Sequence, residues 1–285
     1  MQNIPAHQVY SHHLMQLQTP TEQTRDAFDA AAPVYDQEYE KLPGIIRLRE
    51  TTSRVFLTYF TPGASLLELN CGTGTDALTL AEYGMKVLAT DLSPLMIQEA
   101  QRKIASAHAE DHVTTRVLSF TELDLLHGCS LDGAYSNLGG LNCTNDLSTV
   151  AANLASLIKP YGYFIAVVMP SLCLWETCAS FARLDWKKAM RRRNPQGTIA
   201  NLHGGRVHTF YHSPAKFTEA FSPYFRAVKR LALNTFTPPP NFTNAYRLLD
   251  RSIRLLEKLD DGVAGFPLFA SISDHYLIVL QRKAE

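Results

Sequence analysis

The stretch Leu66-Leu67-Glu68-Leu69-Asn70-Cys71-Gly72-Thr73-Gly74-Thr75-Asp76 decides the fold of this chain. Its pattern predicts a short apolar strand with an acidic residue near the end, then a glycine-rich turn and the start of a helix. Residues without a Cβ let the backbone of such a turn approach a ligand, and the helix points its amino terminus at the same space. The stretch therefore predicts a small-molecule site at the end of a β-strand.

Short apolar runs and helical runs alternate on both sides of this turn. The expected strands are 65–69, 86–90, 113–118, 131–136 and 163–169, and the expected helices between them are 76–83, 94–108 and 146–158. Short crossovers of this kind build a parallel sheet, and ligands gather at the carboxyl ends of its strands. We therefore predict an α/β protein with a doubly wound sheet and a site in the loops that follow the strands.

An acidic residue follows the turn at a distance that suggests a nucleoside. Asp91 stands nineteen residues after Gly72, at the end of the second expected strand, where a carboxylate accepts both hydroxyls of a ribose. Gly72-x-Gly74-x-x-Ala77 also satisfies the relaxed dinucleotide fingerprint, so an NAD(P)-dependent oxidoreductase is an alternative. Glu68 favours a methionine-bearing nucleoside, because a carboxylate beside the turn suits an ammonium group and repels a pyrophosphate.

With these residues in place, the sequence resembles the class I S-adenosylmethionine-dependent methyltransferases, in particular the small-molecule branch that includes the ubiquinone and menaquinone biosynthesis methyltransferases. Three segments carry the resemblance in order, 67–75, 87–96 and 131–137, and it covers residues 25–170. It implies a doubly wound, Rossmann-like, mostly parallel seven-stranded sheet with an antiparallel last strand that contains residues 274–277, and an inserted cap.

The resemblance also implies S-adenosyl-L-methionine as the cofactor and a set of residues around it. Gly72 and Gly74 line it, Asp91 holds the ribose, and Tyr35 belongs to an amino-terminal lid. Leu92 packs on the adenine, Ser119 and Phe120 flank it, and Asn137 and Leu138 lie beside the sulfonium methyl. The complete set that we expect to bind the cofactor is Glu68, Asn70, Cys71, Gly72, Gly74, Asp91, Leu92, Ser119, Phe120, Asn137 and Leu138.

The turn departs from the family at one position, because Asn70 stands where glycine is usual. Asparagine is the residue other than glycine that best tolerates a positive φ, so we expect the turn to persist. The departure bears on how closely the methionine moiety approaches the backbone. It also raises a further alternative, a non-catalytic protein that binds the cofactor.

The domain organisation follows from where the strand–helix rhythm holds and where it fails. We expect a lead-in and lid helices over 1–60, the cofactor-binding core over 61–170, a cap insertion over 171–213, and the rest of the core over 214–285 with a second helical insertion at 238–262. The lead-in takes up residues 1–20, and the lid helices are 24–39, broken at Pro33, and 45–60. The cap should hold one long helical stretch, 173–193, and a strand at 206–212. The later elements should be helix 214–221, strand 225–233, helix 246–259 and strand 275–282.

A sulfonium already activates its methyl group, so the protein chiefly aligns the acceptor and excludes water. A base near neutral pKa helps when the acceptor is a phenol, an enol or an acidic carbon, and histidine is the favoured side chain. His203, His208 and His212 lie in or beside the expected cap, with packing or surface roles as the alternative. We take His208 and His212, together with Tyr35, as the catalytic candidates.

The basic cluster at 187–193 is expected to be a solvated helix end, with the grip of an anionic substrate as the alternative. Twenty-seven basic and 27 acidic residues balance, which disfavours nucleic acid as a partner. Five scattered cysteines without a C-x-x-C pair predict neither disulfides nor a metal site, and no apolar run predicts a membrane span or a signal peptide. We expect a cytoplasmic monomer or homodimer that methylates carbon or oxygen of a small molecule.

Overall fold

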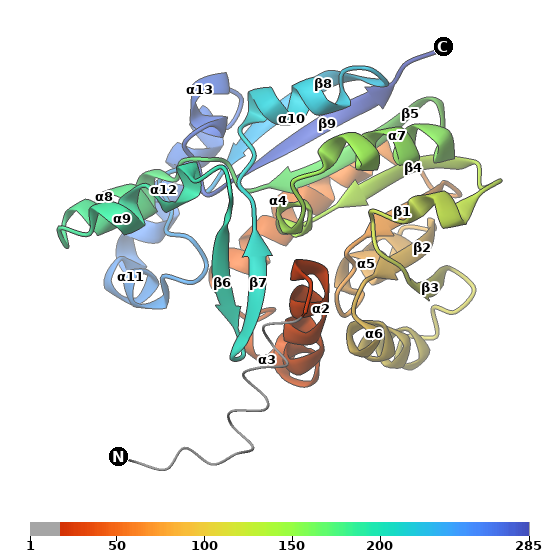
Figure 1. Cartoon of the computed structure of the whole chain (residues 1–285), viewed down its shortest axis with the longest axis horizontal. Coiled ribbons are helices and arrows are strands. Elements are labelled where there is room, and N and C mark those ends of the chain that lie inside the picture. The colour runs from red at the N-terminus through yellow and green to blue at the C-terminus, as the bar shows by residue number, and fades with distance from the viewer. Residues whose placement is uncertain (1–17, 285) are drawn as a thin grey trace.

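The computed structural model describes residues 18–284, and its centre is a seven-stranded sheet with the order β3-β2-β1-β4-β5-β9-β8 (Figure 1). The strands are β1 Ser65–Leu69, β2 Lys86–Asp91, β3 Val113–Val117, β4 Leu131–Ser136, β5 Ile158–Val168, β8 Phe225–Leu233 and β9 His275–Arg282. β1 to β5 pair in parallel, and β9 runs antiparallel to both of its neighbours, β5 and β8. The predicted mostly parallel seven-stranded sheet with an antiparallel last strand is confirmed.

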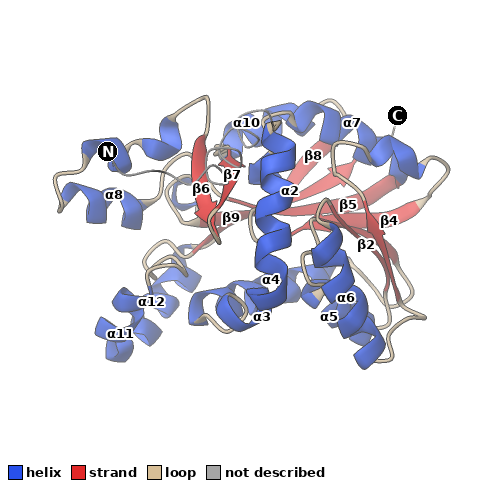
Figure 2. Ribbon diagram, turned by 60° about the horizontal axis from the view of Figure 1, so that its bottom comes forward, coloured by secondary structure: helices blue, strands red, loops and turns tan. Residues whose placement is uncertain are grey.

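Helices cover both faces of the sheet (Figure 2). One face packs on α4 Pro43–Tyr59, α5 Thr75–Glu82 and α6 Pro94–Ser106, and the other on α7 Leu147–Leu157 and α10 Pro214–Phe221. Side chains of a strand alternate between faces, so Leu66 joins the core under α4 and α5, whereas Leu67 and Leu69 join the core under α7. Both faces are apolar, as a sheet that is buried on both sides requires.

The amino-terminal helices lie next to the carboxyl ends of the parallel strands. α2 Pro20–Ala31 begins with a capping box in which Thr19 and Glu22 satisfy each other's backbone N–H groups. It packs against α6 and against β7 Gly205–Thr209, and it is followed by a short 3-10 turn, Ala32–Val34, and α3 Tyr35–Glu38. The break at Pro33 is as predicted. Of the lead-in expected at 1–20, only the last three residues fall within the described chain.

The segment after β5 differs from the single helical stretch that we expected at 173–193. It forms α8 Leu174–Phe181, α9 Trp186–Ala189 and a 3-10 turn, Arg191–Arg193. Leu184 has a φ of 57°, which ends the first helix, and the Asp185 side chain accepts a hydrogen bond from Lys188 N to start the next. β6 Thr198–Leu202 was not predicted. It pairs with β7 in a separate two-stranded sheet and is mostly exposed, so it lacks the apolar alternation that marks a core strand.

The helix expected at 246–259 is also divided. The structure has α11 Thr243–Leu248 and α12 Asp250–Val263 there, followed by α13 Pro267–Ala270 before β9. Two further 3-10 turns, Leu123–Leu126 and Gly140–Cys143, precede and follow β4. Within residues 18–284 no helix has both the length and the apolar composition that crossing a bilayer requires.

Candidate functional site

A cleft with about 1060 Å³ of empty space opens at the carboxyl ends of β1, β2 and β4, under α2 and α3. This is the edge of the sheet at which we expected the ligand, because the strand order reverses between β1 and β4. Ten of the residues singled out from the sequence line it, namely Tyr35, Asn70, Cys71, Gly72, Asp91, Leu92, Ser119, Phe120, Asn137 and Leu138. Four others, Glu68, Gly74, His208 and His212, do not line it.

The glycine-rich turn keeps the shape that the sequence suggested. Asn70 has a φ of 52°, and Gly72 and Gly74 have φ values of 53° and 80°. A Cβ built on Gly72 meets no atom of the described chain within 4 Å, so the turn leaves open space for a ligand. A Cβ on Gly74 would lie 3.1 Å from Ala100 Cβ, so this glycine serves the packing of the turn on α6.

The Asn70 side chain is fixed against the end of β4. Its Nδ2 donates to the carbonyl of Asn137 at 3.1 Å, and Ser136 Oγ donates to its Oδ1 at 2.6 Å. A Cβ on Gly140 would lie 2.0 Å from Asn70 Cγ, so the absence of a side chain at residue 140 makes room for the amide. Asparagine therefore tolerates the positive φ, as predicted, and adds a side chain to the cleft wall.

Asp91 ends β2 with its carboxylate at the cleft. Gly72 N donates to Oδ2 at 2.9 Å and Ser93 N donates to Oδ1 at 2.9 Å, so the carboxylate is held by the glycine turn on one side and by the start of α6 on the other. Burial raises the pKa of Asp91 above its usual value, while these N–H groups act in the opposite direction. An oriented carboxylate at this strand end has the geometry to accept hydroxyl groups of a sugar.

Apolar side chains line the cleft beyond Asp91. They come from α2, from the start of α6 and from the loop after β3, and they are Phe28, Leu92, Met96, Leu118 and Phe120. Ser119 Oγ shares a hydrogen bond of 2.7 Å with Thr121 Oγ1. Apolar walls with a hydroxyl pair at the rim suit a flat heteroaromatic ring, which buries its faces and keeps polar edges for hydrogen bonds.

An ion pair that we did not predict lies at the other end of the cleft. Arg49 from α4 pairs with Asp76, the second residue of α5, and with Glu40 at 2.5 Å, and both Arg49 and Asp76 line the cleft. Asn137 Nδ2 donates to Asp76 Oδ2 at 2.9 Å, which links this pair to the end of β4. Opposite charges side by side match a zwitterionic amino-acid group. The sequence carried only a weak signal, because Arg49 reads as an exposed position in the helix 45–60.

Glu68 is buried on the sheet instead of facing the cleft. It is 1% exposed on the face under α4 and α5, beside Tyr135, and its Oε2 has no hydrogen-bond partner within residues 18–284. Burial, followed by the nearby Asp76 carboxylate, raises the pKa of Glu68 well above its usual range. The structure thus does not support our use of Glu68 as a direct contact for an ammonium group.

A hydrogen bond and an ion pair hold α3 against the glycine turn and α6. Thr73 Oγ1 donates to Asp36 Oδ1 at 2.6 Å, and Lys103 Nζ pairs with Asp36 Oδ2 at 2.8 Å. Tyr35, next to Asp36, lies in the cleft, where burial raises the pKa of its phenol although Arg49 acts in the opposite direction. Tyr35 is therefore a neutral hydrogen-bonding group near neutral pH, which makes it a poor base.

The three cap histidines do not meet at the cleft. His208 Nε2 contacts Gln23 Oε1 of α2 at 3.1 Å, and His203 Nε2 lies 2.9 Å from Glu38 Oε2. His212 is buried, with Nε2 at 2.9 Å from the carbonyl of Thr144, and burial lowers its pKa. These contacts are the packing roles that we named as the alternative to catalysis.

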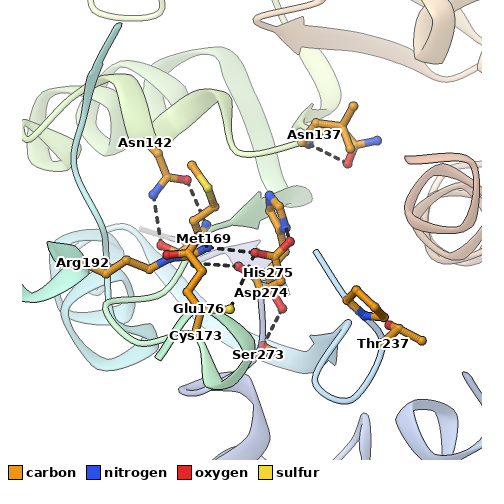
Figure 3. A network of polar contacts seen from close by, with 12 residues as sticks. Asn137, Asn142, Met169, Cys173, Glu176, Arg192, Thr237, Ser273, Asp274 and His275 are labelled. Atoms are coloured by element: carbon orange, nitrogen blue, oxygen red, sulfur yellow. Dashed lines mark hydrogen bonds and ion pairs between the residues drawn. The ribbon is translucent and has the colours of Figure 1, made fainter. Parts of the chain in front are cut away.

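The basic cluster at 187–193 is likewise not a uniformly solvated helix end. Arg192 is only 5% exposed and forms ion pairs of 2.8 Å with both Glu176 and Asp274 (Figure 3). Arg191 also binds Glu176, at 2.7 Å, whereas Arg193 is exposed. The chain reverses at Leu184 and brings these arginines back to Glu176 of α8. The single helix that we predicted over 173–193 would have kept them away from Glu176.

The fold and this cleft define a Rossmann-like protein with a cofactor site at the point where the strand order reverses. Comparison with known proteins finds a match for part of the chain: residues 66–162 match the model of the methyltransferase domain. The matched segment contains the glycine turn, Asp91 and the end of β4, which are the parts that line the cleft.

Individual relatives cover parts of the chain. An S-adenosyl-L-methionine-dependent Diels-Alderase from Talaromyces variabilis is 29% identical over 106 residues, which are 37% of this chain and 36% of that protein. A demethylmenaquinone methyltransferase from Symbiobacterium thermophilum is 26% identical over 151 residues, 50% of this chain and 57% of that protein. The chain thus matches between about a third and somewhat over half of the length of these relatives.

The crystal structure of the [4+2]-cyclase SpnF superposes with a TM-score of 0.61 at 14% identity, covering 92% of this chain and 96% of that one. The likeness extends over nearly the whole chain, including the segments outside 66–162. At this level of identity it establishes the shared fold.

Proposed function

We propose that this protein is an S-adenosylmethionine-dependent methyltransferase that acts on carbon or oxygen of a small-molecule acceptor. One observation carries the proposal. A single cleft places the Asp91 carboxylate between apolar walls on one side and the Arg49–Asp76 ion pair on the other. The apolar walls match an adenine, the carboxylate a ribose and the ion pair an amino-acid group, which is the order in which S-adenosylmethionine joins these three groups.

The chain's own residues would divide the work as follows. Asp91 accepts the ribose hydroxyls, Leu92 and Phe120 enclose the base, and Arg49 with Asp76 receives the carboxylate and ammonium groups. When bound, the cofactor supplies a methyl group activated by a positively charged sulfur. Leu138 and Asn137 line the cleft at the end of β4, where we expect the acceptor to meet the methyl group, while α2 and α3 would exclude water.

Binding of the product S-adenosylhomocysteine tests the cofactor site. A ligand at 100 times its Kd raises the free energy of unfolding by about 2.7 kcal/mol, so melting curves with S-adenosylhomocysteine should shift upward. NADH, the probe for the oxidoreductase alternative, should give no shift. Asp91→Ala should weaken S-adenosylhomocysteine about 10- to 150-fold, because a hydrogen bond to a charged group contributes about 1.5–3 kcal/mol. The exposed Asp111→Ala serves as the control, and no shift with S-adenosylhomocysteine in the parent protein would refute the proposal.

A second candidate is a cofactor-dependent ring closure, favoured by the names of the fungal relative and of the superposed cyclase. A cycloaddition transfers no methyl group, so turnover would leave the cofactor intact. Measuring S-adenosylhomocysteine release during acceptor screening separates the two, because methyl transfer produces one molecule per turnover and cyclisation produces none.

The same reading extends to partners and location. We propose that the protein works on small molecules in the cytoplasm, as a monomer or homodimer, with no nucleic-acid partner. The balance of 27 basic and 27 acidic residues supports a small-molecule acceptor over a polyanion. Five free cysteines, two of them buried, are compatible with a reducing compartment.

A further inference from the structure

A histidine outside the predicted set lies at the ligand-binding edge of the sheet. His275 is the first residue of β9, and because β9 is antiparallel, its start meets the carboxyl ends of its neighbours, with His275 opposite Leu233 of β8 and Tyr276 opposite Val168 of β5. A Cβ on Gly139 would lie 3.4 Å from His275 Nε2. Gly139 stands between Leu138 and Gly140, which both line the cleft. Neither Gly139 nor His275 lines it, so the imidazole lies behind the loop that should face the transferred methyl.

The ring is oriented by a buried carboxylate. His275 Nδ1 lies 2.9 Å from Asp274 Oδ2, and Asp274 is 3% exposed. Burial by itself raises the pKa of Asp274, but His275 and Arg192 outweigh burial and hold the pKa well below its usual value. Asp274 is therefore ionised and accepts a hydrogen bond from Nδ1, which directs Nε2 away from the carboxylate.

Further contacts hold the carboxylate in place. Arg192 donates to Asp274 Oδ1 at 2.8 Å and to its carbonyl at 3.0 Å, and it binds Glu176 of α8 through two hydrogen bonds of 2.8 and 3.1 Å. Figure 3 shows the His275 ring pointing away from the Arg192–Glu176 pair. Nε2 has no hydrogen-bond partner within residues 18–284, and it is not among the polar atoms that are fully buried there. A base needs such a free nitrogen.

We propose that His275 is the general base that removes the acceptor's proton and that Asp274 is its positioning residue, anchored by Arg192 and Glu176. The inference rests on the proposed methyl transfer and names the acceptor class as one with an acidic O–H or C–H group. The carbon or oxygen of the acceptor bonds to the methyl carbon while its proton passes to Nε2. The electron pair of the methyl–sulfur bond returns to sulfur, and the imidazolium then releases its proton to water.

Nuclear magnetic resonance of the full chain labelled with ¹⁵N-histidine tests this without an identified acceptor. Long-range ¹H–¹⁵N spectra at pH 7.5 should show a proton on Nδ1 of His275, with the His275 signals assigned by their loss in His275→Gln. S-adenosylhomocysteine should shift these signals and leave those of His212 in place. If S-adenosylhomocysteine does not bind, the proposed function fails and the inference fails with it. If it binds while His275 carries its proton on Nε2, or while the His275 signals do not move, the inference alone is overturned.

Variants separate the base from its positioning residue. Asp274→Asn should move the proton of His275 toward Nε2, with the upward melting shift by S-adenosylhomocysteine retained as evidence of folding. With any phenol or acidic carbon compound that supports turnover, His275→Gln should lower kcat about 10²- to 10⁴-fold, the usual contribution of a general base, and leave the Kd of S-adenosylhomocysteine unchanged. The matched variant His212→Gln should keep kcat. Equal kcat values for His275→Gln and the parent would overturn the assignment.

Discussion

Arg192→Met is expected to cost much of the stability of this protein. Arg192 is 5% exposed, and four hydrogen bonds join it to Glu176 and Asp274. Methionine fills a similar volume but leaves two buried carboxylates, and removing one partner of a buried ion pair costs about 3–5 kcal/mol. Arg191 still binds Glu176, so we expect the lower end, about 3 kcal/mol, or a fall in Tm of about 5 °C for a chain of 285 residues.

Urea unfolding of the parent, Arg192→Met and the exposed Arg193→Met measures this effect. Arg193→Met should stay within about 0.5 kcal/mol of the parent in its free energy of unfolding.

The pH dependence of the free energy of unfolding gives a second test of the ion pair. Burial raises the pKa of Asp274, but His275 and Arg192 lower this pKa by more than burial raises it. The pKa of Asp274 is therefore lower in the folded than in the unfolded protein. Its stabilisation is then present above the unfolded pKa of about 3.9 and is lost as the pH falls below that value. The difference between parent and Arg192→Met should narrow from pH 5 to pH 3. A loss no larger than that of Arg193→Met would refute the reasoning.

Two neighbouring acids and one histidine give further expectations. Asp260 is buried and accepts hydrogen bonds from three backbone N–H groups and one hydroxyl of residues 235–237, so Asp260→Ala should cost about 2–4 kcal/mol by leaving these donors unpaired. Its exposed neighbour Asp261 pairs with Arg47, and Asp261→Ala should cost under about 1 kcal/mol in the same denaturation assay, so equal losses for the two variants would contradict this account. Burial lowers the pKa of His212 below the unfolded value of about 6.5, so its folded state resists protonation and stability should fall as the pH drops below that value. Urea unfolding at pH 7.5 and 5.5 should show a smaller loss in His212→Gln, and a loss equal to that of the parent would exclude this source.

The sheet and the cofactor turn could be predicted because local patterns determine them. Alternating apolar runs specify strands, and a turn such as 70–74 needs residues that tolerate a positive φ, which is visible in the letters themselves. Asp91 was found for the same reason, since a fixed spacing from the turn places it at the next strand end. These features require no knowledge of which distant segments pack together.

The errors share a different cause, which is dependence on packing. Glu68 alternates with Leu67 and Leu69, so the period of the strand sends its side chain to the sheet face under α4 instead of toward the ligand. Arg49 reaches the cleft only because α4 packs on α5, and the proposed base His275 comes to the same edge of the sheet because β9 inserts between β5 and β8. No local pattern in the sequence marks either residue as part of the site.

The buried network of Glu176, Arg192, Asp274 and His275 connects two segments that lie far apart in the sequence. Glu176 and Arg192 belong to the expected cap insertion, 171–213, whereas Asp274 and His275 stand at the start of the last strand of the core. Because Arg192 bonds to the Asp274 carboxylate and to its carbonyl, a displacement of α8 changes the hydrogen bond that sets the His275 tautomer. If His275 removes the acceptor's proton and the cap contacts the acceptor, the cap also adjusts the base that activates the acceptor. Substitutions in α8 should then alter kcat as well as KM, whereas a cap that only contacts the acceptor would alter KM alone.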